Sequence, residues 1–462
     1  MQSDKTRHNS ALCNLSSGLA FICALAIYWF TADSSVSYWD CPEYTATASR
    51  LDVGHPPGNP VWSLTMRMAT IPFDSPDHAY VVNLCSGLFM ALSVFFLARI
   101  IYMLAEYVLT DKHKADIICP FVSVAGALCF AFCDSAWFSA VEAEVYAMSA
   151  FLSALTIWLA LLWARVRPVA AKRRLLILIA YITGLSLGVH QLNLLCIPVV
   201  ALIYAFATKQ GKGHCMRAWG ILLMSFATVG AILMGLMNGA LMICEQFELF
   251  AVNTLRLPYF SGTVAYAVLT PATFIASIYA AGRWPRPVMQ ALLFLAVWLS
   301  GLTVFGSHII AGGIMAAILS AAVWLPEVSR GRIQTGIWML GFIWLGYSSF
   351  AMILIRGNAS PPMNEGAPTD IFALHRYIAR DQYGSKPLFY GATPYSRPML
   401  REEWKPGAGT PDYRQFVLKK KRPVYVRLLP EARLHYRSGF IEAGDSAANR
   451  KALTMADDNY LL

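Results

Sequence analysis

The chain has 462 residues, of which 57% are hydrophobic and only 14% are charged. Soluble domains average about 45–50% apolar and about 25% charged residues, so this composition excludes an ordinary soluble enzyme and a disordered chain. The net charge of +10 does not indicate nucleic-acid binding, because membrane proteins concentrate Lys and Arg in their cytoplasmic loops.

Charged residues are concentrated toward the C-terminal end of the chain. Residues 356–462 carry 17 of the 37 Lys and Arg residues and 11 of the 27 Asp and Glu residues. We therefore divide the chain into a membrane domain, residues 1–355, and a soluble tail, residues 356–462. The first apolar stretch lacks a small-residue cleavage site and is interpreted as a retained helix. The ten cysteines show no metal-binding spacing and predict no disulfide framework.

Eleven apolar stretches are predicted to span the membrane, because a spanning helix needs about 20 mostly apolar residues. They are 14–32, 80–105, 117–133, 145–164, 175–189, 192–207, 218–243, 264–281, 288–305, 309–325 and 335–355. Two of them result from dividing the apolar run 175–207, since one helix of that length would measure about 50 Å against a hydrocarbon core of about 30 Å. The same argument divides 288–325, and the turns are placed at His190 and at Gly306-Ser307-His308.

Basic residues support this count and orient the chain. With the N-terminus in the cytoplasm, the inner loops hold sixteen positive residues and the outer loops only three, as the positive-inside rule requires. The inner residues are Lys5, Arg7, Lys112, Lys114, Arg165, Arg167, Lys172, Arg173, Arg174, Lys209, Lys212, Arg217, Arg283, Arg286, Arg330 and Arg332. The outer residues are Arg50, Arg67 and Arg256. Eleven spans place the C-terminal tail on the outer side.

The first outer loop, residues 33–79, is the candidate active site. It contains Tyr38-Trp39-Asp40-Cys41-Pro42-Glu43-Tyr44 and the stiff turn Gly54-His55-Pro56-Pro57-Gly58. Asp40 and Glu43 are three residues apart and can share one helix face. A carboxylate that is partly desolvated at the bilayer surface has a raised pKa and becomes a better base for a hydroxyl proton. The alternative is that Asp40 caps a helix and the prolines only shape the loop.

Other outer-side residues are weaker candidates for substrate binding. Residues 61–71 of the first loop are predicted to form an amphipathic helix in the interface. Glu142, Glu144 and Tyr146 lie at the start of the fourth span, where the acids could bind sugar hydroxyls or stabilise the helix N-terminus. His55 and His190 could donate to a lipid phosphate or only bond a neighbouring helix. Arg256, the one cation of its loop, could contact that phosphate.

The loop motifs resemble a known family of membrane glycosyltransferases. The order of spans and motifs looks like the GT-C superfamily, and more closely like a bacterial family of unknown function, common in Bacteroidetes, whose vertebrate relatives are transmembrane protein O-mannosyltransferases. The resemblance covers about residues 14–400. It is carried by Trp39–Tyr44, Val53–Gly58, Trp137–Ala147, Phe247–Phe250 with Val252-Asn253 and Leu257-Pro258, Asn358 with Pro361–Glu365, and Arg380–Gly384 with Pro387–Gly391.

The resemblance implies an all-α polytopic membrane protein with a GT-C-like domain and an enzymatic activity. The implied reaction transfers a sugar, expected to be mannose, from a polyprenyl-phosphate sugar to Ser or Thr hydroxyls of proteins, with inversion. Asp40 would act as the base, with Glu43 as its neighbour or substitute. The outer loops contain no DxD motif, so neither a metal nor another cofactor is expected. The expected partners are the lipid-linked donor, a secreted or periplasmic protein acceptor and the bilayer, without nucleic acid.

The tail is expected to be a small α/β unit outside the cell. Residues 369–380 predict a helix, and 387–390 and 424–428 predict short strands, while the basic run Lys419–Arg422 is interpreted as solvated surface. The expected location is a bacterial cytoplasmic membrane, with the endoplasmic reticulum membrane as the alternative. Two other functions stay open. One is a transporter or flippase for a lipid-linked sugar, although no repeat or mid-span acid favours it. The other is an inactive subunit of a glycosylation complex, suggested by a tail shorter than is usual in that family.

Overall fold

A computed structural model describes residues 2–208, 214–306, 308–326 and 328–384. Helices account for the ordered elements of these ranges, and the one β-type contact within them is an isolated parallel bridge between Val53 and Asn364. The protein is therefore an all-α polytopic membrane protein, as the composition and the apolar stretches predicted. The strands expected at 387–390 and 424–428, and the basic run 419–422, lie outside the described residues.

The first half of the membrane domain contains nine α-helices and two short 3₁₀ segments. They are α1 (Gln2–Thr31), α2 (Cys41–Arg50), α3 (Pro60–Thr70), η1 (Ser75–Asp77), α4 (His78–Val108), α5 (Lys112–Ala131), α6 (Asp134–Val141), α7 (Val145–Arg165), α8 (Val169–Leu187), η2 (Gln191–Leu195) and α9 (Cys196–Thr208). Buried alanines such as Ala24, Ala91 and Ala127 lie where α1, α4 and α5 meet. Small residues let spanning helices approach closely, which is how such helices associate in lipid.

The second half contains the remaining helices. They are α10 (His214–Gly230), η3 (Ala231–Met237), α11 (Asn238–Leu249), η4 (Phe250–Thr254), α12 (Ser261–Arg283), α13 (Arg286–Leu299), α14 (Ile309–Ser320), η5 (Ala321–Trp324), α15 (Arg330–Tyr347), η6 (Ser348–Phe350), α16 (Ala351–Asn358), α17 (Ile371–Ile378) and η7 (Asp381–Tyr383). The segments η3 and η4 are π-helical: η3 joins α10 to α11, and η4 extends α11 to Thr254.

The breaks predicted in the long apolar runs are present. A turn containing His190 separates α8 from η2, and residues 300–308 separate α13 from α14. Among the described residues, eight helices are long and apolar enough to cross a membrane, three fewer than the eleven expected spans. The other three expected spans correspond to α8, α13 and α14, which are present as helices. α13 and α14 are shorter apolar helices, and α8 contains the basic triplet 172–174 in its first two turns.

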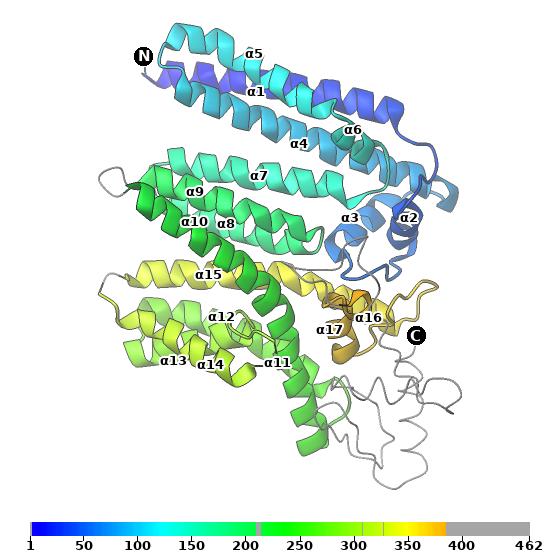
Figure 1. Ribbon diagram of the computed structural model, residues 1–462, viewed down its shortest axis with the longest axis vertical. Helices are drawn as coiled ribbons and strands as arrows, with labels where there is room; N and C mark the ends of the chain where they lie inside the picture. The colour runs from blue at the N-terminus through cyan, green and yellow to red at the C-terminus, as the bar shows by residue number, and fades with distance from the viewer. Residues whose placement is uncertain (1, 209–213, 307, 327, 385–462) are drawn as a thin grey trace, which may run out of the picture.

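The short helices gather at one end of the bundle. Figure 1 shows α2, α3, α6, α16 and α17 together at that end, while the first turn of α1 lies at the opposite end. Loops that are far apart in the chain therefore meet there: the first outer loop, the connection before α7 and the segment after the last span. This end of the bundle carries the candidate site.

Candidate active site

The helix α2 follows Asp40 directly, and the chain reaches it through a strained residue. Trp39 has a positive φ of 62°, a conformation that bulky residues rarely adopt. Asp40 occupies the N-cap position, but its side chain makes no capping hydrogen bond and is exposed. Asp40 thus stands at the N-cap without a side-chain capping bond, and its carboxylate is exposed.

Glu43, one turn further along α2, is bound by His55. The Glu43 carboxylate accepts hydrogen bonds from the His55 backbone N–H at 2.7 Å and pairs with the His55 Nδ1 at 2.8 Å. Burial raises the pKa of Glu43, but the hydrogen bonds from His55 outweigh burial and leave that pKa below its ordinary value. The bond to Glu43 in turn raises the pKa of His55, against the opposing effect of burial. The two residues therefore favour an ion pair.

Two buried aromatic residues connect this pair to the next loop. The Tyr44 ring lies 5.1 Å from the ring of Trp62 and 5.8 Å from that of His55. Trp62, on α3, is fully buried and donates its indole N–H to the backbone oxygen of Glu144 at 3.2 Å. The expected helix at 61–71 is present as α3. Its apolar residues are divided between a buried face with Trp62 and an exposed face with Met68.

Glu144 is a buried carboxylate with a raised pKa. It is buried just before α7 and makes no side-chain capping bond. Burial, followed by the charges of Asp40 and Glu142, raises its pKa to about 7. Burial also raises the pKa of Glu142. The expectation of a raised pKa was made for the carboxylates of the first outer loop, and it is wrong for Glu43. Raised pKa values are found instead at Glu142 and Glu144, just before α7.

The remaining predicted residues divide into two groups. The ring of Tyr146 lies 5.3 Å from that of His190, so these two residues contact each other. His190 accepts the backbone N–H of Leu192 at 3.3 Å, and burial, assisted by the charge of Arg380, lowers its pKa. It therefore acts as a neutral acceptor within the turn. Arg256 is exposed in the loop after η4, and no described contact joins it to the acidic cluster.

Glu365 is a residue of the cluster that sequence reasoning did not assign. It follows the last span, and its backbone N–H donates to the Val53 oxygen at 3.0 Å. Burial raises its pKa, and the negative charges of Glu43 and Asp40 raise it further. In the sequence, Glu365 stands out only as a member of the block 361–365, which carries part of the family resemblance. The spacing of residues in that block predicted no chemical role for it. We refer to Asp40, Glu43, Glu144 and Glu365 as the acidic cluster.

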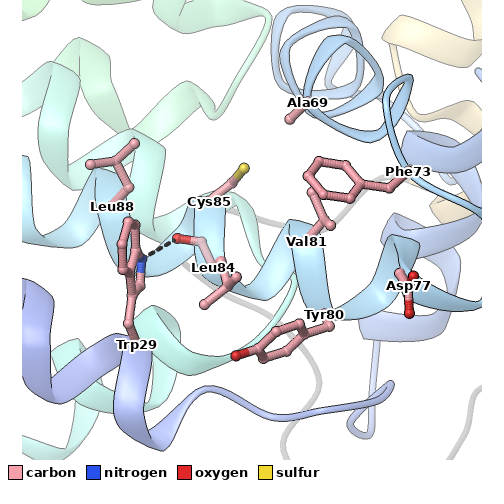
Figure 2. Close-up of a pocket in the computed structure, with 9 residues that line it drawn as sticks. All are labelled: Trp29, Ala69, Phe73, Asp77, Tyr80, Val81, Leu84, Cys85 and Leu88. Atoms are coloured by element: carbon pink, nitrogen blue, oxygen red, sulfur yellow. Dashed lines mark hydrogen bonds between the residues drawn. The ribbon is translucent and has the colours of Figure 1, made fainter.

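An apolar cavity lies at the end of the bundle that carries α2 and α3. It has a volume of about 420 Å³ and is formed where the end of α1, the end of α3 and the start of α4 meet. Figure 2 shows the Trp29 indole on one wall, bonded to the Leu84 carbonyl at 2.9 Å, with Phe73 and Tyr80 on others. Asp77 is the only charged residue among those lining it. Such walls suit a hydrocarbon chain better than a sugar.

No group of three or more His, Cys, Asp or Glu within the described ranges is arranged to hold a metal ion. Metal independence of the chemistry stays a prediction, as does the absence of another cofactor.

The fold and the acidic cluster define a class of protein: a membrane-embedded helical protein with carboxylates and a histidine gathered at one end of its bundle. Residues 40–213 match the model of the family described as "Protein O-mannosyl-transferase TMEM260 N-terminal domain". This segment begins at Asp40 and includes all of the predicted site residues except Arg256.

Two curated proteins are similar to part of the chain. "Protein O-mannosyl-transferase tmem260" of Dictyostelium discoideum is 24% identical over 45% of this chain. "Protein O-mannosyl-transferase TMEM260" of Mus musculus is 27% identical over 36% of this chain. The aligned segments span only 24% and 22% of those two proteins. No solved structure matches the chain significantly. Part of the chain, including residues 40–213, is thus similar to the TMEM260 O-mannosyl-transferases, as the resemblance of the motifs implied.

Proposed function

We propose that the protein is a glycosyltransferase that moves a sugar, mannose by analogy with its relatives, from a polyprenyl-phosphate sugar to Ser or Thr hydroxyls of a protein. The observation that carries the proposal is the acidic cluster at one end of a membrane bundle, with an uncapped, exposed Asp40 beside the Glu43–His55 pair. The names of the related proteins support the acceptor chemistry.

In this reaction the carboxylate of Asp40 accepts the proton of the Ser or Thr hydroxyl. The hydroxyl oxygen forms a bond to the anomeric carbon of the sugar, and the bond from that carbon to the phosphate oxygen breaks. The polyprenyl phosphate leaves with the electron pair, so the sugar carbon is inverted. The protonated His55, held by Glu43, is suited to face the departing phosphate, and Glu144 and Tyr146 to contact sugar hydroxyls.

The test is the Asp40→Asn variant, assayed in membranes with a polyprenyl-phosphate mannose and a Ser/Thr peptide. Loss of a general base lowers the rate by about 10²–10⁴-fold, while expression is expected to be unchanged. Asp74→Asn is the matched control, because Asp74 is an exposed carboxylate of the same loop. Wild-type rates in Asp40→Asn would remove Asp40 as the base. Sugar-lipid translocation without transfer by the wild type would support a transporter instead.

The proposal also places the protein in a bacterial cytoplasmic membrane, with the acidic cluster and the tail outside and secreted or periplasmic proteins as acceptors. The endoplasmic reticulum membrane is the alternative. The support is the asymmetry of basic residues between the two sets of loops. Neither a metal ion nor another cofactor is part of the proposal, because the departing group is already a phosphate.

A further inference from the structure

The segment that follows the last span covers the first outer loop. Arg356, at the end of α16, donates from Nε to the Leu51 carbonyl at 2.7 Å and from a terminal nitrogen to the Arg50 carbonyl at 3.1 Å. These bonds reach the residues that end α2, where Leu51 has a positive φ of 54°. The guanidinium therefore satisfies carbonyls that the helix end leaves without partners.

The next contact is the parallel bridge between Val53 and Asn364. Val53 donates its N–H to the Met363 carbonyl at 3.0 Å and accepts the N–H of Glu365 at 3.0 Å. Both backbone groups of Val53 are thus bonded to the later segment, and Glu365 is brought to the cluster by the same bridge.

Within this later segment, Tyr377 is the residue that bonds the backbone of residues 54 and 55. Its hydroxyl lies 2.5 Å from the carbonyl of Gly54 and 3.2 Å from that of His55, and its side chain is buried. The helix α17 that carries Tyr377 is itself anchored twice. Asp370 caps its N-terminus, and His375 pairs with Glu245 of α11 at 2.7 Å. The hydroxyl is therefore held in place from outside the loop that it contacts.

The geometry points to Tyr377 as a positioning residue for the transfer reaction. Its hydroxyl fixes the backbone of residues 54–55, so that the His55 backbone N–H and imidazole both stay on the Glu43 carboxylate. This inference rests on the proposed function for its catalytic consequence, but the placement of His55 is measurable without any activity.

Removing the hydroxyl leaves the two carbonyls without their donor and frees the turn to move. The charged groups whose fields reach His55 are Glu43, Asp40, Glu365 and Glu144, and the Tyr44 ring packs beside the imidazole. Because the bond to Glu43 raises the pKa of His55, a looser pair lowers that pKa toward its ordinary value.

The direct test measures how fast diethyl pyrocarbonate modifies His55 at each pH, since only the unprotonated imidazole reacts. The side chain of His55 is 28% exposed, and peptide mass spectrometry resolves it from the other eight histidines of the chain. In Tyr377→Phe we expect the midpoint for His55 to fall by about half a pH unit or more. Tyr383→Phe, the matched control in η7, is expected to keep the wild-type midpoint. An unchanged midpoint in Tyr377→Phe would overturn the inference.

A second measurement tests the consequence for transfer. Tyr377→Phe is expected to lower kcat about tenfold in the wild-type background and to have no further effect in a His55→Gln background, because both substitutions disturb the same pair. Equal losses in both backgrounds would show that Tyr377 does not act through His55. If the wild type transfers no sugar, the proposed function fails, while the modification experiment still decides the placement of His55.

Should Tyr377→Phe fail to accumulate in membranes, His375→Ala replaces it in the modification experiment. This variant removes the pair with Glu245 that anchors α17, so the Tyr377 hydroxyl is held less firmly on residues 54 and 55 and a lower midpoint for His55 is again expected. A wild-type midpoint in a folded His375→Ala protein would then contradict the inference that α17 positions His55 through Tyr377.

Discussion

Neighbouring carboxylates in the acidic cluster have opposite pKa shifts, and their different partners explain why. Glu43 and Glu144 are both largely removed from water, which by itself disfavours the charged form of each. Glu43 receives two hydrogen bonds from His55 and is held ionised. Glu144 lies near the charges of Asp40 and Glu142, and its pKa of about 7 makes it a group that changes charge near neutral pH.

Glu144→Gln is expected to change how stability depends on pH. The folded pKa of Glu144 is raised from 4.5 to about 7, so the folded state binds more protons than the unfolded state between these values. The contribution of Glu144 to stability is therefore greatest below about pH 4.5 and is lost as the pH rises to about 7, by up to about 3 kcal/mol. The variant lacks this loss and should be the more stable protein at pH 8, as measured by thermal unfolding in detergent.

The comparison uses the difference in melting temperature between the variant and the wild type at pH 5 and at pH 8. That difference should increase in favour of Glu144→Gln at the higher pH. A difference that stays constant would show that the Glu144 carboxylate does not lose solvation on folding.

Most residues of the acidic cluster could be predicted from the sequence, but the contacts that fix their positions could not. Asp40, Glu43 and His55 are close in the chain, so spacing and turn chemistry bring them to one loop. Tyr377 and Gly54 are 323 positions apart, and nothing in local periodicity joins them. Arg256 was predicted as a phosphate contact only because it is the one cation in its loop. That criterion says nothing about where its side chain lies relative to the acidic cluster.

At the scale of elements, the two long apolar runs were divided correctly because length against bilayer thickness is a strong constraint. The run 218–243 was ended too early. The structure continues it through η3 and α11 to Thr254, past Glu245 and Glu248. Glu248 accepts the backbone N–H groups of Phe260 and Thr263 at 2.6 and 2.8 Å. In the sequence, a charged residue indicates the end of a membrane span. Here the backbone N–H groups of Phe260 and Thr263 bind the Glu248 carboxylate, so the helix continues past it.

The helices α8 and α15 approach closely where each has a glycine, Gly184 and Gly346, because neither residue has a side chain to separate the two backbones. A Cβ atom at Gly346 would overlap the backbone of Gly184 and Leu185. Backbone cannot move aside as a flexible side chain can, so Gly346→Ala is expected to destabilise the protein by at least about 1–3 kcal/mol. Gly336→Ala is the matched control on the same helix, because nothing lies within 4 Å of a Cβ there.

Thermal unfolding in detergent distinguishes the two variants. Gly336→Ala should unfold at or above the wild-type temperature, since alanine is the better helix former by about 1 kcal/mol. Gly346→Ala should unfold at a lower temperature. If both variants behave alike, the close approach of α8 and α15 is not a feature of the folded protein.

At the scale of the whole molecule, contacts between described residues link the basic turns to one another. Arg165 pairs with Glu106 at 2.7 Å, Arg173 bonds Gln334 at 2.8 Å, and Arg330 bonds the Trp284 carbonyl at 2.9 Å. These residues come from helix ends that the charge count assigned to one side. The sequence could predict this grouping because charge asymmetry acts on every loop, whereas each loop's internal geometry depends on contacts with distant segments.

The length of α4 makes the orientation of the bundle in the membrane testable. The helix α4 has 31 residues and is about 46 Å long, more than the hydrocarbon core of about 30 Å, so its ends reach opposite surfaces. Ser75 precedes it on the side of the acidic cluster, and Lys114 follows it on the side of the basic turns. Both residues are exposed.

In a background with the exposed Cys129, Cys133 and Cys215 replaced by Ser, a membrane-impermeant maleimide is expected to label Ser75→Cys in intact spheroplasts. Lys114→Cys should be labelled only after the membrane is permeabilised, because sixteen of the basic loop residues hold that side in the cytoplasm. Labelling in the reverse pattern would place the acidic cluster in the cytoplasm. The proposed acceptors, which are secreted proteins, could not then reach Asp40.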